Sequence, residues 1–355
     1  MIHRSVAIAF IVASATHASA AGPVKLDRFK VNCVTTGYYS CQQPALVFVH
    51  GIWGSASTWR KGSASWPQLV ADDPAMKAFD IYLINYDTYL SPHPNAKVSA
   101  TQLEKEIRAV LQPEMDRYQA VYIVAHSLGG NLIRQYLAQV KISHFPDPHE
   151  YMRRYKGLFL LATPVTGSDK QKFAKYVLGS ETLRSLAPIS ENDYLQELNE
   201  TWEGLQFRLT NAGHPIMVWA AFEKRPLFGL SLIVTQESAV AATKSPIAAC
   251  LEPDDDIRGF DRDHESIVKP TGDKDEVYTW VRGQLLKYIV LNTNLEWSIV
   301  DKPKVMEDAI RAAKQGNCDT AIQAAFFTQE HNPRVVDALM LDIGPRQVCS
   351  YLCRR

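Results

Sequence analysis

Ser127 stands between small residues in the segment Ala125-His126-Ser127-Leu128-Gly129, directly after the apolar stretch 120–124. A serine hydroxyl is a weak nucleophile unless the chain holds it exposed beside a base, and a tight strand-to-helix turn does this only when its neighbours are small. Alanine at the first small position departs modestly from the usual glycine and still leaves room for the turn. A helical pattern follows at 131–140. We therefore predict that Ser127 attacks a carbonyl carbon.

A second motif, His50-Gly51-Ile52-Trp53-Gly54, follows the apolar run 45–49 well upstream of the serine. Attack on a carbonyl places negative charge on its oxygen, and losing one backbone N–H donor to that oxygen typically costs about 2.7–4 kcal/mol of transition-state stabilisation. A loop of this kind offers such a donor. We assign the oxyanion hole to the backbone N–H groups of Ile52 and Leu128, and we interpret His50 as a residue that orients the loop.

Short apolar segments alternate with helical patterns through most of the chain. In 99–111, for example, apolar residues fall on one helical face and charged residues on the other. Strands that alternate with helices imply an α/β protein with a mostly parallel sheet and helices on both faces. The predicted strands are 45–49, 81–84, 120–124, 158–161 and 216–222, and the predicted helices are 99–111, 131–140 and 277–291.

Three further segments are expected outside this alternation. Residues 1–20 have the basic, apolar and small-residue order of a cleavable signal peptide, which predicts an exported protein, periplasmic or secreted. The α/β domain would then occupy 21–292. Within it, residues from about 170 to 211 break the alternation and are expected to form a lid-like insertion. Residues 293–355 are expected to form a small helical C-terminal appendage.

With these motifs, roughly residues 44 to 290 resemble the α/β-hydrolase superfamily, and within it the lipase-like branch that carries a Thr-Pro turn, here Ala162-Thr163-Pro164-Val165. The chain is also similar to the SERAC-like and PGAP-like serine esterases and lipases. Their later blocks read here as Phe222-Glu223, Ile233-Val234-Thr235-Gln236-Glu237-Ser238-Ala239 and Asp263-His264-Glu265-Ser266-Ile267-Val268-Lys269. The resemblance implies an α/β-hydrolase fold and a carboxylic ester hydrolase.

His264 is the candidate for the general base. This fold orders its catalytic residues as serine, acid and histidine, so the base must come late in the chain. His264 precedes the predicted helix 277–291, which is where the superfamily places its base. We expect structural or surface roles for the other histidines that we weighed, His144, His149, His214 and His331.

The acid is harder to assign, because the common superfamily position holds Ser231, which cannot stabilise an imidazolium as a carboxylate does. Glu223 directly follows the predicted strand 216–222, so its carboxylate would emerge at the sheet edge where the site forms. The resemblance places a glutamate there too. We therefore predict Glu223 as the acid that orients the base, with Glu237 and the run Asp254-Asp255-Asp256 as rivals.

Charge and cysteine content limit the partners. Lys plus Arg and Asp plus Glu are equal at 38 each, so no long-range field favours nucleic acid, and no nucleic-acid partner is expected. The six cysteines suit disulfides in an oxidising compartment, and Cys33 and Cys41 bracket a short loop that a disulfide could close. No cysteine and histidine cluster supports a metal site, and the sequence predicts no cofactor.

The predicted reaction is hydrolysis of a carboxylic ester with a lipid-like acyl group, through an acyl-enzyme on Ser127 with His264 as base and Glu223 as acid. A thioesterase or acyltransferase would use the same three residues. A catalytically silent hydrolase-fold module that binds through its helical C-terminal tail is the alternative from another class. The sequence leaves open contact with lipid surfaces, the acyl-chain length and the oligomeric state.

Overall fold

A computed structural model of the chain describes residues 24–33, 41, 43–52, 54–86, 100–139, 151–167, 193–212, 215–227, 232–243 and 256–292. The predicted signal peptide, most of the predicted lid and the predicted appendage lie outside these residues. So do all cysteines except Cys33 and Cys41, which form the disulfide that their spacing suggested.

The centre of the fold is a seven-stranded sheet in the order β1-β5-β2-β6-β7-β8-β9. Only β1 is antiparallel to its neighbour, and the other six strands pair in parallel. Because parallel strands share a direction, the carboxyl ends of β2, β6, β8 and β9 meet at one edge of the sheet. The strands are β1 Lys25–Lys30, β2 Ala45–Val49, β5 Asp80–Asn85, β6 Val121–His126, β7 Tyr155–Leu161, β8 Met217–Glu223 and β9 Ile257–Phe260.

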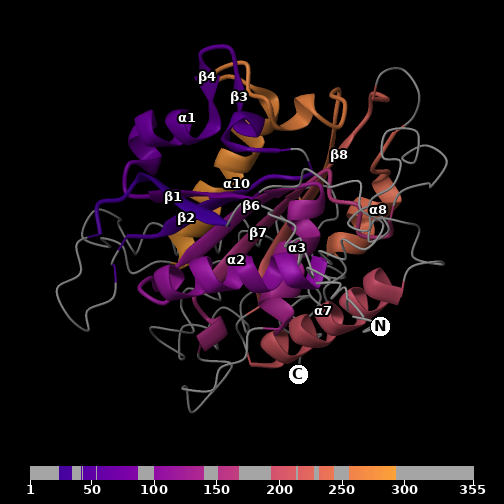
Figure 1. Cartoon of the computed structure of the whole chain (residues 1–355). Helices are drawn as coiled ribbons and strands as arrows, with labels where there is room; N and C mark the ends of the chain where they lie inside the picture. Colours follow the sequence, from indigo (N-terminus) through magenta and orange to yellow (C-terminus); the bar gives the residue numbers. More distant parts are fainter. Residues whose placement is uncertain are drawn as a thin grey trace, which may run out of the picture.

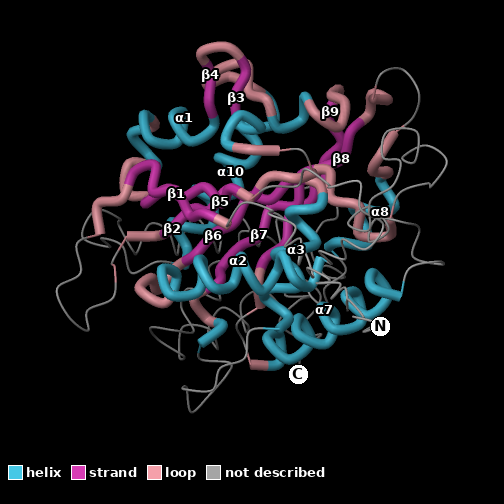
Figure 2. Tube along the Cα trace, viewed as in Figure 1, coloured by secondary structure: helices cyan, strands magenta, loops and turns pink. Residues whose placement is uncertain are grey.

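Helices cover both faces of this sheet, as Figures 1 and 2 show. On one face lie α1 and α10, and on the other lie α2, α3 and α7. A small hairpin of β3 (Arg60–Lys61) and β4 (Ala64–Ser65) stands above α1. The helices are α1 Trp66–Asp72, α2 Ala100–Met115, α3 Leu128–Gln139, α7 Asp193–Asn211, α8 Gln236–Thr243 and α10 Glu276–Asn292, with short 3₁₀ helices at Ala56–Trp59, Pro74–Met76 and Ser266–Val268.

The sheet separates two hydrophobic cores. Successive side chains of a strand point to opposite faces, so in β2 Ala45, Val47 and Val49 join the core under α2 and α3, while Leu46 and Phe48 join the core under α1 and α10. All five residues of β2 are buried. Burial on both faces explains why the central strands read as continuous apolar runs in the sequence.

The α/β class, the five predicted strands and the three predicted helices are confirmed, with shifts at their ends. The largest shift is in α2, which ends at Met115 rather than at residue 111, and α3 begins at Leu128 rather than at residue 131. The described end of the predicted lid, residues 193–211, is the long helix α7, whose apolar side packs into the core beside α3. Among the described residues no helix has the length and apolar character needed to cross a membrane.

Candidate active site

Ser127 occupies a sharp turn between β6 and α3. The strand ends at His126 and the helix begins at Leu128, so one residue makes the whole reversal. Its φ of 53° lies in the left-handed region, which costs a non-glycine residue free energy and persists only where surrounding contacts fix it. Here the Ser127 N–H donates to the carbonyl of Leu161 at 3.1 Å, and its own carbonyl accepts from Gly130 N–H at 3.0 Å. The strand-turn-helix geometry predicted around Ser127 is therefore present.

The glycines around this turn allow close approach of three segments. A Cβ atom on Gly129 would overlap the backbone oxygens of Val49 and His50 at the end of β2. A Cβ atom on Gly51 would lie 2.7 Å from the Cβ of Ser127. The absence of these side chains lets the start of α3 and the loop after β2 lie directly against the serine.

His264 meets the serine from the loop after β9. Its Nε2 atom lies 2.9 Å from the Oγ atom of Ser127, so the hydroxyl can donate to the ring nitrogen. The two residues are 137 positions apart, and both are almost fully buried. The structure thus brings together the nucleophile and base that the sequence predicted, at the distance that proton transfer requires.

Glu223 is the last residue of β8 and lies behind His264, with no exposed surface. Its Oε1 atom accepts hydrogen bonds from the backbone N–H groups of Ile233 at 2.7 Å and Val234 at 2.6 Å. The same oxygen lies 3.5 Å from Nδ1 of His264. Within the described part of the chain, neither that Nδ1 nor the second carboxylate oxygen has a hydrogen-bond partner. The two groups therefore face each other, at slightly more than hydrogen-bond distance.

The rival acids are Glu237 and the run 254–256. Glu237 is exposed in the first turn of α8. Asp254 and Asp255 lie outside the described residues, and Asp256 directly precedes β9. Glu223 is the predicted acid that the structure places beside His264.

The loop after β2 is held by the side chain of His50. Its Nδ1–H donates to the carbonyl of Gly51 at 2.8 Å, and its Nε2 accepts from the backbone N–H of Tyr86 at 3.3 Å. The ring stacks on that of Tyr86 with centroids 4.1 Å apart. Burial lowers the pKa of His50 to about 4, so the ring is neutral at pH 7. These contacts fit the interpretation of His50 as a residue that orients the loop.

The two residues assigned to the oxyanion hole flank the serine. Leu128 is the first residue of α3, and the first N–H groups of a helix have no partner within that helix and favour negative charge. Ile52 follows Gly51, the residue that touches the serine from the loop after β2. Both N–H groups thus come from segments in contact with Ser127.

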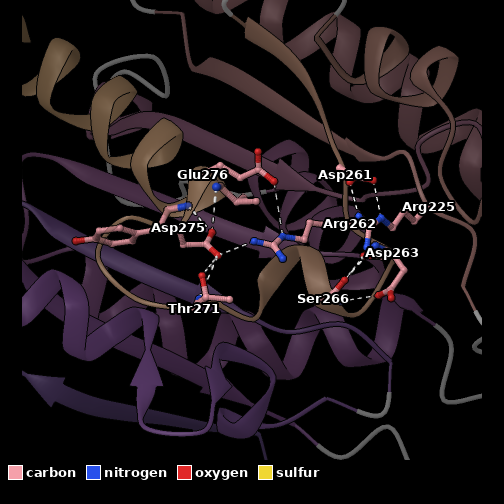
Figure 3. A network of polar contacts seen from close by, with 10 residues as sticks. Arg225, Asp261, Arg262, Asp263, Ser266, Thr271, Asp275 and Glu276 are labelled. Carbon is pink, nitrogen blue, oxygen red and sulfur yellow. Dashed lines mark hydrogen bonds and ion pairs between the residues drawn. The ribbon is translucent and has the colours of Figure 1, made fainter.

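Polar contacts fix the base loop, residues 261–265, on both sides of its histidine (Figure 3). Asp263 caps the turn that follows, because its Oδ1 accepts from the backbone N–H groups of Glu265 at 3.1 Å and Ser266 at 2.8 Å. The hydroxyl of Ser266 in turn accepts from Asp263 N–H at 3.0 Å. An ion pair between Arg225 and Asp261 lies on the exposed side of the same loop.

Asp275 joins the base loop to the start of α10. Its Oδ1 accepts from the backbone N–H groups of Val277 at 3.0 Å and Tyr278 at 3.2 Å, which satisfies two free donors at the helix N-terminus. Its Oδ2 accepts from the N–H and hydroxyl of Thr271 and from the guanidinium of Arg262, each at 3.1 Å. One buried carboxylate therefore holds the helix and the base loop together, as drawn in Figure 3.

The Thr-Pro turn after β7 is held by Ser238, which belongs to the Ile-Val-x-x-x-Ser-Ala block. Ser238, buried in α8, accepts hydrogen bonds at its Oγ from the backbone N–H groups of Val165 at 2.9 Å and Thr166 at 3.2 Å. Asn131 of α3 donates to the carbonyl of Pro164 at 3.1 Å. The Ile-Val-x-x-x-Ser-Ala block thus has two tasks: its first residues bind the carboxylate of Glu223, and its serine binds the Thr-Pro turn.

A buried cation completes the support of this turn. Arg134 is almost fully buried in α3, and burial lowers its pKa to about 10, so it stays charged at pH 7. Its guanidinium donates to the side-chain oxygens of Asn131 at 3.3 Å and Asn199 at 2.8 Å, and Asn199 donates to the carbonyl of Val165 at 3.1 Å. Sequence reasoning missed this group, since spacing in the chain does not reveal its partners.

Sequence reasoning also assigned no role to His126, the residue before the serine. Its Nε2–H donates to the backbone carbonyl of His264 at 2.8 Å, and the centroids of the two rings lie 5.0 Å apart. Among the described residues no three histidine, cysteine or acidic side chains gather where they could hold a metal ion.

Residues 42–196 match the model of a family described as "Putative serine esterase (DUF676)". This match covers the loop after β2, the turn of Ser127 and the Thr-Pro turn, all on a mostly parallel sheet. Ser127, Glu223 and His264 follow one another along the chain in the order of serine, acid and histidine that is typical of the α/β-hydrolase fold. The chain has an α/β-hydrolase fold. No curated protein matches its sequence.

Several solved structures are similar to this chain. They include the lipase BlEst2 of Bacillus licheniformis in its mature form, at 20% identity and a TM-score of 0.38 over 71% of this chain and 96% of that one. Phospholipase PlaB of Legionella pneumophila matches at 18% identity and a TM-score of 0.38, over 52% of this chain and 40% of that one. The monoacylglycerol lipase of Paleococcus ferrophilus matches at 13% identity and a TM-score of 0.43, over 75% and 99%.

Proposed function

We propose that this α/β-hydrolase cleaves carboxylic esters with lipid-like acyl groups through an acyl-enzyme on Ser127. One observation carries the proposal: the 2.9 Å contact between Ser127 Oγ and His264 Nε2, with the buried carboxylate of Glu223 on the other side of the imidazole. A nucleophile, a base and a group that orients the base are the parts that acyl transfer needs. The match to a serine esterase family model supports the same reaction class.

In the first half-reaction, Ser127 Oγ forms a bond to the carbonyl carbon of the ester while its proton passes to Nε2 of His264. The imidazolium then carries its second proton on Nδ1, facing Glu223 at 3.5 Å. A buried carboxylate favours this cation strongly, because little solvent screens the pair. The negative charge on the carbonyl oxygen would be met by the N–H groups of Leu128 and Ile52.

The tetrahedral intermediate collapses when His264 returns the proton to the leaving alcohol and the bond to that alcohol breaks. In the second half-reaction, a water molecule attacks the acyl carbon and gives its proton to the same Nε2 atom. The bond to Ser127 Oγ breaks, and the serine regains its proton from His264. The base therefore has to reach Ser127 and the leaving group from one position.

The lipid-like substrate rests on the Thr-Pro turn of the lipase-like branch. We further propose that the protein is exported, since residues 1–20 have the order of a signal peptide. The disulfide between Cys33 and Cys41 fits an oxidising compartment.

The direct test is covalent labelling with a fluorophosphonate, which reacts with an activated serine and not with an ordinary one. We expect the wild type to be labelled and Ser127→Ala to be silent. Ser57→Ala, which removes an exposed serine, is the matched control and should be labelled like the wild type. Labelling that persists in Ser127→Ala would show that the nucleophile lies elsewhere.

A panel of chromogenic esters with short and long acyl chains, together with a matching thioester, tests the substrate class. A lipid-like substrate predicts that turnover increases from short to medium or long acyl chains. Faster turnover of the thioester than of the ester would identify a thioesterase. A wild type that is neither labelled nor active on the panel would favour the silent binding module.

A further inference from the structure

Two consecutive residues bind the same histidine. Ser127 meets the side chain of His264 through the 2.9 Å contact to Nε2, and His126 meets the main chain of His264 through the 2.8 Å bond to its carbonyl oxygen. The end of β6 is therefore joined to the base loop at two points of one residue. A pair of contacts of this kind fixes the base relative to the nucleophile in orientation as well as in distance.

The hydrogen bond determines the tautomer of His126. A carbonyl oxygen can only accept, so Nε2 of His126 carries the ring proton. Burial and the neighbouring His264 hold the pKa of His126 well below its usual range, so the ring is neutral. Its Nδ1 atom is then an unprotonated nitrogen that has no hydrogen-bond partner among the described residues.

A neutral ring at this place suits the proposed reaction. His264 must become a cation next to Ser127, and the ring of His126 lies only 5.0 Å away. A second cation there would oppose that step, since like charges repel strongly where solvent is excluded. His126 can donate its hydrogen bond without that cost, which a lysine or arginine could not.

The hydrogen bond from His126 also fixes a part of the base loop that the other contacts do not bind, the carbonyl of His264. Asp263 and Ser266 fix the turn around His264 through hydrogen bonds to backbone N–H groups. Arg262, just before Asp263, donates to the carboxylate of Asp275 at the start of α10. Among the described residues, the carbonyl of His264 has its hydrogen bond from His126. Loss of that donor would leave a buried acceptor and free the loop to rotate about the residue that carries the base.

We propose that His126 is a positioning residue that holds the main chain of His264 so that Nε2 faces Ser127, an inference that rests on the proposed function. Misplacement of a reacting group by about 1 Å can cost about 100-fold in rate, so the effect should fall on the chemical step. Substrate binding should change little.

Three substitutions separate this role from general packing. Glutamine places its amide nitrogen as many bonds from Cβ as Nε2 of histidine, so His126→Gln keeps the donor. His126→Asn is equally polar, but its amide stops at the position of Nδ1. His126→Leu fills similar space with no donor. Hydrolysis of a chromogenic ester, the rate of fluorophosphonate labelling and thermal unfolding would be measured for each.

We expect kcat and the labelling rate to fall about 10- to 100-fold in His126→Asn and His126→Leu, with KM within about twofold of the wild type. His126→Gln should stay within about threefold. If His126→Leu does not fold, the glutamine and asparagine variants decide the question alone. Equal rates in the glutamine and asparagine variants, with both folded, would overturn the positioning role. A wild type that is not labelled at all would instead count against the proposed function.

Discussion

The Oε1 atom of Glu223 faces Nδ1 of His264 at 3.5 Å while it accepts two backbone hydrogen bonds from Ile233 and Val234. The two N–H groups fix the carboxylate at the end of β8. They also leave the second oxygen, Oε2, without a partner in the described part of the chain. A small rotation of either side chain would therefore close the hydrogen bond to the base.

This arrangement predicts the result of Glu223→Gln. The glutamine oxygen would take the place of Oε1, so it would still accept from the two N–H groups and still face Nδ1 of His264. The side chain would carry no negative charge, so the imidazolium that forms when His264 takes the proton of Ser127 would lose its stabilisation. We expect kcat to fall about 10³- to 10⁴-fold with little change in KM, measured with a chromogenic ester.

The matched control for this carboxylate is Glu237→Gln, which removes an exposed acid in the first turn of α8. It should keep wild-type kcat and labelling. The assignment of the acid would be wrong if Glu237→Gln lost activity and Glu223→Gln kept it. Thermal unfolding of both variants shows whether either change acts through stability.

Asp275 gives a second prediction, because five donors converge on its carboxylate from α10, Thr271 and Arg262. In Asp275→Asn, the NH₂ group must face donors that it cannot bind. We expect a loss of about 2–4 kcal/mol in the free energy of unfolding, measured by urea titration. The rate of fluorophosphonate labelling should fall as well, since Arg262 no longer anchors the base loop.

The control for Asp275 is Asp261, which lies in the base loop (Figure 3). Asp261 pairs with Arg225, and both side chains are largely exposed. Solvent screens such a pair, so Asp261→Asn should change neither unfolding nor labelling measurably. If both aspartate variants behaved alike, the network around Asp275 would have no special part in holding the base loop.

The strands that the sequence predicted are those whose residues are buried on both faces of the sheet. All five residues of β2 and all six of β6 are buried, so these strands appear as apolar runs. The edge strand β1 was missed because four of its six residues are exposed, and β9 because it has only four residues. Pairing at a sheet edge depends on the neighbouring strand, and that strand leaves no pattern in the edge sequence itself.

The candidate site divides in the same way. Ser127 and His264 could be predicted because a tight turn needs small neighbours and the fold orders its residues along the chain. The acid could only be ranked, because two backbone N–H groups position Glu223, and any residue type can supply those. The bond from His126 to a carbonyl escaped prediction for the same reason. A partner that binds through its main chain can be any residue type, so the sequence does not mark it.

Gly51 supplies a third prediction from close packing. A Cβ atom there would lie 2.7 Å from the Cβ of Ser127, closer than real Cβ atoms approach, and 3.1 Å from the carbonyl oxygen of His126, which is tighter than most Cβ contacts. In Gly51→Ala, the loop or the serine must move. We expect the fluorophosphonate labelling rate to fall by about 100-fold or more, since small displacements of the reacting groups are costly.

The comparison for Gly51 is Gly283→Ala in α10, where a Cβ atom meets nothing within 4 Å. Alanine loses less backbone entropy than glycine on forming a helix, so this variant should gain about 0.5–1 kcal/mol in stability. Its labelling rate should equal that of the wild type. Wild-type labelling in Gly51→Ala would mean that the loop after β2 does not touch the nucleophile as described.

His50 makes stability depend on pH in a predictable direction. Its pKa falls from 6.5 to about 4 on burial, so between these values the unfolded chain binds a proton that the folded chain does not. Unfolding therefore becomes easier as pH falls through this window, and stability is regained as pH rises. From pH 7 to pH 5 this one group should cost about 2 kcal/mol in the free energy of unfolding. The buried ring of His126 acts in the same direction.

Urea unfolding of the wild type and His50→Gln at pH 5, 7 and 8 isolates this contribution. Glutamine does not titrate, so the variant should lose about 2 kcal/mol less than the wild type between pH 7 and pH 5. Between pH 8 and pH 7 neither form of His50 gains a substantial charge, so the difference between the two proteins should stay constant there. Other titrating groups are common to both proteins and cancel in the comparison. An equal loss in both proteins at pH 5 would mean that His50 can bind a proton in the folded state, which its burial between Gly51 and Tyr86 should prevent.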